Sequence, residues 1–211
     1  IPMQEQLRDT LLQLRDEREV RALILTGEGR GFCAGLDLGG YGTAPHTEHL
    51  GRTQAGFAVQ KHIATLMPKL RSLPQPVIAA VNGPAAGGGF ALVLGSDIRL
   101  AARSAKFNAA FIRIGLSACD IGVSYFLPRM VGSSVAAEYM LTGRFIDAER
   151  AYQLGLVSRV VAPEAMQAEA QSFAADMLHA TPLGLRLTKE ALNHAIDAQG
   201  LEATIAMEDR N

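Results

Sequence analysis

Two glycine-rich segments, 31–38 and 82–90, each follow a short apolar run and precede a stretch with helical character. The apolar runs are rich in Val, Ile, Leu and Ala, as the buried strands of a parallel sheet are. A helix start leaves backbone N–H groups without acceptors, and its dipole favours negative charge. Because glycine has no side chain, a ligand oxygen can approach these groups closely. Two such turns facing one point would form an oxyanion hole.

Strand-like and helix-like segments alternate along the chain, which predicts an α/β fold with parallel strands. The predicted strands are 20–26, 76–81, 98–102 and 157–161. The predicted helices are 3–19, a segment around 63–70, then 90–94, 123–131, 148–154, 164–180 and 182–198, with a long loop over 27–56. Asp147 is a good N-cap for the helix that follows it. The second half is mostly helical, which suggests a helical layer on a sheet-based core.

Composition narrows the class of protein. The chain has 211 residues, 48% of them hydrophobic, which suits one soluble globular domain. The formal net charge of −1 offers no basic excess for nucleic acid. Only two cysteines, no secretory leader and no apolar run long enough for a bilayer lead us to expect a cytoplasmic protein. The sequence has no Gly-x-Ser-x-Gly elbow and no P-loop, which disfavours serine hydrolysis and P-loop nucleotide binding.

The motifs resemble those of the enoyl-CoA hydratase/isomerase (crotonase) family. Four blocks match in order and spacing: 23–27 with 31–38; 79–83 with 86–89 and 96–99; 142–144 with 151–157; and 185–192. The resemblance runs from about Gln4 to the C-terminus and is far more specific than any single glycine motif.

The resemblance implies an α/β fold of the crotonase (ClpP/crotonase-like) type, a spiral of ββα units with a helical C-terminal region. It divides the chain into a spiral core over 1–150 and a helical trimerisation region over 151–211. It also implies a homotrimer or a dimer of trimers. Relative to the family, the chain looks short of its opening N-terminal strands and of its final helical segment.

The resemblance further implies an unsaturated acyl-CoA thioester as substrate, with coenzyme A bound as part of it and no other cofactor. The backbone N–H groups of Leu36 and Gly88 would be the oxyanion donors. Their neighbours would contact the substrate, namely Ala34, Gly35, Asp37, Gly87 and Gly89. We expect no metal, because the histidines do not cluster with cysteines or carboxylates. We also expect no nucleic-acid or membrane partner.

The acid/base positions depart from the family pattern. Two glutamates usual in enoyl-CoA hydratases read Ala91 and Phe111 here, and neither can move a proton. Asp120 remains, at about the point where dienoyl-CoA isomerases, dihydroxynaphthoyl-CoA synthases and 4-chlorobenzoyl-CoA dehalogenases place a catalytic aspartate, with one extra residue after Gly115. Apolar neighbours would partly desolvate Asp120, which favours proton transfer. Asp120 could instead, or in addition, cap a helix that begins near Ile121.

Three functions therefore stay open. One carboxylate suits double-bond isomerisation better than hydration, although one group can serve both steps of hydration in turn. Loss of both glutamates also fits a non-catalytic acyl-CoA binder. A distant alternative is an NAD- or FAD-dependent oxidoreductase, because 29–34 fits Gly-x-Gly-x-x-Ala after a strand. That fingerprint should open a long helix, whereas Gly39, Gly40 and Pro45 interrupt the segment.

Overall fold

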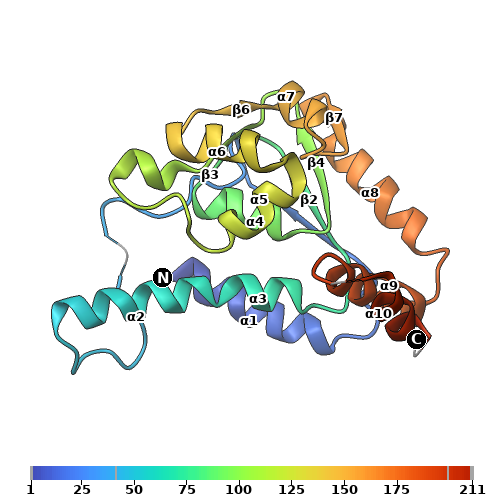
Figure 1. Cartoon of the computed structure of the whole chain (residues 1–211), viewed down its shortest axis with the longest axis horizontal. Helices are drawn as coiled ribbons and strands as arrows, with labels where there is room; N and C mark the ends of the chain where they lie inside the picture. The colour runs from blue at the N-terminus through green and yellow to red at the C-terminus, as the bar shows by residue number, and fades with distance from the viewer. Residues whose placement is uncertain (1, 41, 199, 210–211) are drawn as a thin grey trace.

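A four-stranded parallel sheet forms the centre of the molecule (Figure 1). The computed structural model describes residues 2–40, 42–198 and 200–209. The strand order is β1-β2-β4-β7, with β1 at Leu23–Thr26, β2 at Val77–Val81, β4 at Ile98–Ala102 and β7 at Arg159–Val161. All four strands fall where the sequence predicts them. The predicted α/β fold with parallel strands is therefore confirmed.

The central strand β2 is buried on both faces, so its side chains alternate between two apolar layers. Val77, Ala79 and Val81 pack in the layer that contains α4 (Gly88–Gly95). Ile78 and Ala80 pack against the other layer, which includes residues of α8 (Met166–Met177). Figure 1 shows these two helices on opposite faces of the sheet. Such two-sided burial explains why the strand reads as a continuous apolar run.

The remaining helices include those predicted, in the predicted order, and two more at 133–142 and 201–208. They are α1 Pro2–Asp16, α2 Arg52–Ala64, α3 Leu66–Arg71, α5 Val123–Val131, α6 Ser133–Thr142, α7 Ala148–Gln153, α9 Pro182–Ala195 and α10 Leu201–Glu208, with short 3₁₀ helices at Ala110–Ile114 and Pro163–Ala165. The predicted cap of α7 is confirmed, because the Arg150 N–H donates to Asp147 at 2.8 Å. The single helix predicted around 63–70 is wrong, since the chain breaks at Thr65 between α2 and α3. Pro68 has no N–H to donate back across that break.

A second, three-stranded sheet lies beside α4. It has the order β3-β5-β6, with β3 at Ala85–Ala86, β5 at Lys106–Asn108 and β6 at Ile146–Asp147. β3 and β6 have only two residues each, which is too short for a period to show in the sequence, and none of these three strands is among those predicted. Strand β7 of the central sheet and helix α8, which packs on that sheet, both lie after residue 150. The division of the chain into 1–150 and 151–211 stays a prediction. Among the described helices, none has the length and apolar character needed to cross a membrane.

Candidate active site at the two glycine loops

The two glycine-rich loops pair with each other directly before α4. Cys33 and Ala85 form a parallel β-bridge. The Phe32 N–H donates to the Pro84 carbonyl at 3.0 Å, and the Ala86 N–H donates to the Cys33 carbonyl at 2.9 Å. Two segments about fifty residues apart in sequence therefore run side by side for three residues. This pairing fixes the position of the first loop against the start of α4.

The loops approach so closely that side chains are excluded at several glycines, among them Gly35 and Gly89. A Cβ atom on Gly35 would lie 2.7 Å from the Ala86 carbonyl oxygen and 3.0 Å from the Gly88 nitrogen. A Cβ atom on Gly89 would lie 2.0 Å from the Cys33 carbonyl oxygen. Gly35 also has a φ of +90°, which favours glycine. The absence of side chains thus brings the backbone next to Leu36 against the first residue of α4.

A cavity of about 60 Å³ lies at this contact, with Leu36, Gly88 and Asp120 in its wall. Within the described residues, neither the Leu36 nor the Gly88 N–H has a hydrogen-bond acceptor. Gly88 opens α4, so its free N–H carries the positive end of the helix dipole. The geometry therefore provides two unpaired backbone donors and one carboxylate at the same small cavity.

The structure separates the predicted substrate contacts into two groups. Gly35 lines the cavity with Leu36 and Gly88, whereas Gly87 and Gly89 flank Gly88 without lining it. Ala34 and Asp37 are exposed and also lie outside the wall. Asp37 accepts a hydrogen bond from the Gly39 N–H at 2.8 Å, which makes it part of a local turn.

Asp120 is half-buried and is the only carboxylate among the described residues that line the cavity. Its Oδ1 accepts hydrogen bonds from the Ile121 N–H at 2.8 Å and from the side-chain amide of Gln60. The side chain of Asp120 does not cap helix α5, as one of the two sequence interpretations had it. Helix α5 begins at Val123 after an N-cap at Gly122 with no side-chain cap, and it is the carbonyl of Asp120 that accepts from the Val123 N–H at 2.9 Å.

The two positions where the family pattern has glutamates are apolar in space as well as in sequence. Ala91 is fully buried in α4. Phe111 lines the cavity, and its ring lies 3.5 Å from the point where a Cβ atom on Gly87 would be. These two positions therefore provide apolar surroundings and no second acid.

Residues of α1 and α2 complete the cavity, and the sequence interpretation did not find them. They are Met3, Gln4 and Leu7 from α1, with Gln60 and Ile63 from α2. The spacing of Gln60 and Ile63 places them on one face of α2. No local pattern marks these residues as part of a site, because only the tertiary packing of the two helices brings them to the glycine loops.

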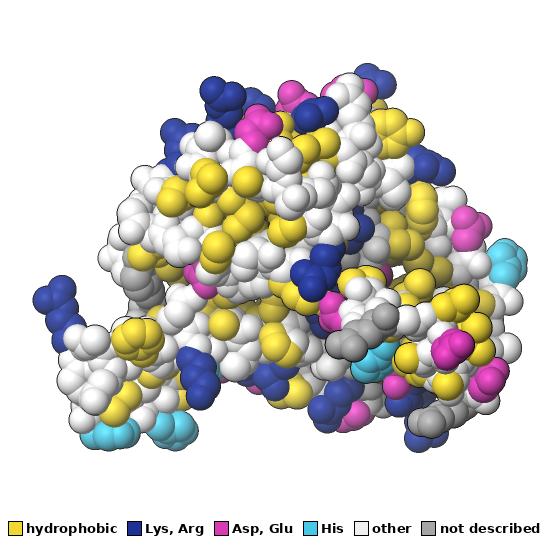
Figure 2. Space-filling view, in the orientation of Figure 1, with side chains coloured by type: hydrophobic (Ala, Val, Ile, Leu, Met, Phe, Trp, Pro, Cys, Tyr) yellow, Lys and Arg dark blue, Asp and Glu magenta, His cyan; other side chains and the backbone are white. Residues whose placement is uncertain are grey.

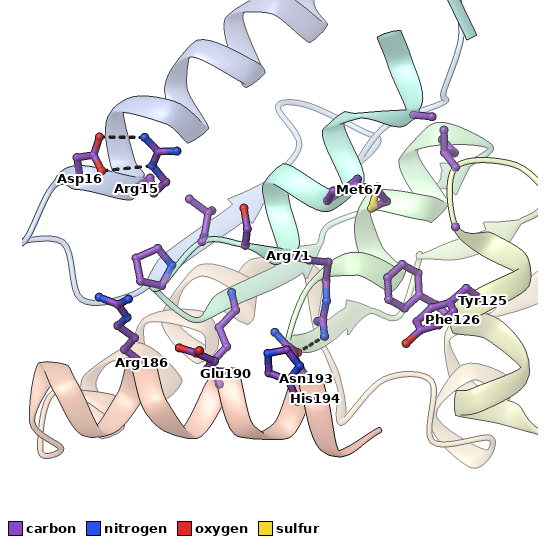
Figure 3. Close-up of a pocket in the computed structure, with 18 residues that line it drawn as sticks. Arg15, Asp16, Met67, Arg71, Tyr125, Phe126, Arg186, Glu190, Asn193 and His194 are labelled. Atoms are coloured by element: carbon purple, nitrogen blue, oxygen red, sulfur yellow. Dashed lines mark hydrogen bonds and ion pairs between the residues drawn. The ribbon is translucent and has the colours of Figure 1, made fainter. Parts of the chain in front are cut away.

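A larger cavity of about 1000 Å³ lies next to the small one, between α9 and the helices α1, α3 and α5 (Figure 3). Both cavities share Met67 and Ile121 in their walls. Lys189 from α9 and Arg71 from α3 line it, and both are ion-paired to Asp97, at 2.8 and 3.1 Å. Burial lowers the pKa of Lys189, and the nearby Asp97 only partly offsets this.

The dinucleotide fingerprint lacks the context that it requires. The described residues between β1 and α2, 27–40 and 42–51, contain turns and one β-bridge, and helix α2 begins only at Arg52. The long helix that an NAD- or FAD-binding turn should open is therefore absent from those residues. The glycines of 29–35 serve instead in the contact with the second loop.

The chain is similar in sequence and in structure to known proteins. A sequence model of the family described as enoyl-CoA hydratase/isomerase matches residues 2–211. A probable enoyl-CoA hydratase of Mycobacterium tuberculosis is 46% identical over 202 residues, which cover 96% of this chain and 71% of that protein. The 1,2-epoxyphenylacetyl-CoA isomerase of Escherichia coli is 41% identical over 193 residues, covering 92% and 72%. The crystal structure of a probable enoyl-CoA hydratase/isomerase from Mycobacterium abscessus superposes with a TM-score of 0.92 at 36% identity, covering 99% of this chain and 77% of that chain.

Proposed function

Since the chain belongs to the enoyl-CoA hydratase/isomerase family and has its crotonase fold, we propose that this enzyme shifts the double bond of an unsaturated acyl-CoA thioester. One observation carries the proposal. The small cavity combines two unpaired backbone N–H groups with a single carboxylate among its described lining residues. That set suffices for an enolate mechanism with one proton carrier.

The backbone N–H groups of Leu36 and Gly88 stabilise the thioester oxygen as negative charge builds on it. Fixed donors of this kind contribute roughly 2.7–4 kcal/mol each to transition-state stabilisation. Their effect is strong here because the surrounding wall is apolar, with Leu66, Leu92 and Phe111 nearby. The positive end of α4 adds to the same field at Gly88.

Asp120 carries the proton. Its carboxylate removes a proton from the α-carbon of a 3-enoyl thioester, and the electron pair delocalises into the dienolate whose oxygen the two N–H groups hold. The resulting carboxylic acid returns the proton to the γ-carbon, which yields the 2-enoyl thioester and restores the carboxylate. No water or other reactant is consumed. Hydration by two separate groups, a base for water and an acid for the α-carbon, is not supported, because the two glutamate positions are occupied by Ala91 and Phe111.

The small cavity alone is too small for the substrate, because ligand pockets usually measure about 300–1,000 Å³. We assign the rest of the acyl-CoA to the larger cavity beyond Met67 and Ile121, whose volume of about 1000 Å³ supports this assignment. Coenzyme A is then bound as part of the substrate, and the mechanism requires no other cofactor.

The family resemblance also leads us to propose a homotrimer or a dimer of trimers. Apolar side chains exposed on α9 and α10 support an assembly in which these helices are covered; they are Leu183, Leu192, Leu201 and Ile205. Figure 2 shows hydrophobic side chains gathered on the surface over these two helices.

The proposal is tested with a panel of enoyl-, dienoyl- and aryl-CoA thioesters assayed with the wild type and with Asp120→Asn. We expect isomerisation by the wild type, and a kcat roughly 10²- to 10⁴-fold lower in the variant with thioester binding retained. Asp176→Asn on the exposed surface of α8 is the matched control and should keep full turnover. Full turnover by Asp120→Asn would contradict the proton role. Binding without any turnover by the wild type would favour the non-catalytic acyl-CoA binder.

A further inference from the structure

The side-chain amide of Gln60 reaches from α2 to Asp120 and donates a hydrogen bond to Oδ1. It is the only side chain among the described residues that hydrogen-bonds Asp120. We propose that Gln60 is a positioning residue that sets which oxygen of Asp120 carries the proton. This inference rests on the proposed function, because it assigns a role to a neighbour of the proton carrier in that mechanism.

The two oxygens of Asp120 are in different situations. Oδ1 accepts from both the Ile121 N–H and the Gln60 amide. Oδ2 accepts no hydrogen bond from the described part of the protein. Two donors on one oxygen fix the plane of the carboxylate and stabilise charge on that atom. Oδ2 is left as the oxygen that is free to take and return the substrate proton.

The two donors differ in how they are held. The Ile121 N–H belongs to a turn in which Ile121 has a φ of 38°, an uncommon conformation for a β-branched residue. The position of the Ile121 N–H is therefore fixed by the backbone. Gln60 lies 60 residues earlier, at the exposed edge of the cavity on α2, and reaches Asp120 through a flexible side chain. Gln60 is thus the adjustable part of the arrangement.

The chemistry of an amide suits this position. Glutamine donates to a carboxylate without adding a charge, whereas lysine or arginine would favour the ionised form so strongly that the carboxylate would become a poor base. Carboxylates at this position would repel Asp120. A neutral donor orients the proton carrier and leaves it able to accept and release a proton in turn.

The attachment of α2 does not depend on Gln60. The Arg8 side chain of α1 donates to the Thr65 hydroxyl at 2.9 Å and to the His62 carbonyl at 2.8 Å. Glu5 of α1 pairs with the His62 ring. The C-terminal end of α2 therefore stays against α1 without the contact to Asp120. This separates the role of Gln60 in positioning from a merely structural role.

The test replaces Gln60 with Leu, which has a similar size and no donor, and uses Gln54→Leu as the control. Gln54 lies on the exposed surface of the same helix and does not line the cavity. For Gln60→Leu we expect kcat on the best enoyl thioester to fall about tenfold, as for a lost hydrogen bond to a charged group, with KM little changed. Gln60→Glu should lower kcat further, because its carboxylate would repel that of Asp120.

A second measurement does not depend on turnover. In the ligand-free protein at neutral pH, the ¹³C NMR chemical shift of the Asp120 carboxyl, assigned with Asp120→Asn, should change in Gln60→Leu and keep its wild-type value in Gln54→Leu. Melting temperatures of the two variants should match. An unchanged chemical shift, or an unchanged kcat, overturns the role of Gln60. Full turnover by Asp120→Asn overturns the proposed function itself, and the positioning role with it, whatever the chemical shift does.

Discussion

The loops that form the candidate site and the helices at the C-terminal end are held by different kinds of contact. Six of the eight residues of α4 are buried, and a Cβ atom added at Gly89 would collide with the backbone of Cys33. In α9 the only buried residue is Lys189, and in α10 none is buried within its described residues. Close packing thus fixes the site, whereas polar contacts hold α9. Regions with few buried apolar contacts open locally at lower free energy, so we expect the C-terminal helices to detach before the site unfolds.

The largest expected effect comes from adding one methyl group where the loops meet. In Gly89→Ala the new Cβ atom would lie 2.0 Å from the Cys33 carbonyl oxygen, and backbone atoms on both sides cannot yield easily. We expect the free energy of unfolding to fall by about 3 kcal/mol, measured by urea denaturation. Gly56→Ala on the exposed surface of α2 has open space around it and should stabilise the protein by up to about 1 kcal/mol. Equal stability of the two variants would show that the loops are not tightly packed.

A smaller, local effect is expected when the polar contacts of Lys189 on α9 are removed. The Lys189 ammonium donates to the Gln75 carbonyl at 2.8 Å and pairs with Asp97, so Lys189→Met leaves a carbonyl and a partly buried carboxylate with fewer partners. We expect a loss of about 2 kcal/mol. Amide hydrogen exchange should accelerate across α9 while β2 and β4 keep their protection. Lys61→Met, at an exposed position of α2, is the control. Equal acceleration in β2 would mean that α9 and the sheet unfold as one unit.

The same contrast explains what could be predicted from the sequence. Buried strands and glycine turns leave local patterns in the sequence, so the parallel sheet and the positions of the two loops could be predicted. The contribution of α1 and α2 to the cavity was not, because Gln60 and Leu7 reach it only through packing between distant segments. The break between α2 and α3 could not be predicted either, because an apolar spacing that spans Thr65 fits one helix as well as two.

The smallest expected effect concerns a partly exposed polar contact on the α1–α2 wall of the site. The hydrogen bond with His62 lowers the pKa of Glu5 from its ordinary value of 4.5. The folded protein therefore binds fewer protons than the unfolded chain at acidic pH, so the contact contributes stability above about pH 4.5 that is lost as the pH falls through the lowered pKa. Glu5→Gln should remove this part of the acid dependence, measured as unfolding free energy against pH, while Glu202→Gln on α10 should not. An acid dependence unchanged by Glu5→Gln would show that the contact between Glu5 and His62 adds no stability to the α1–α2 wall of the site.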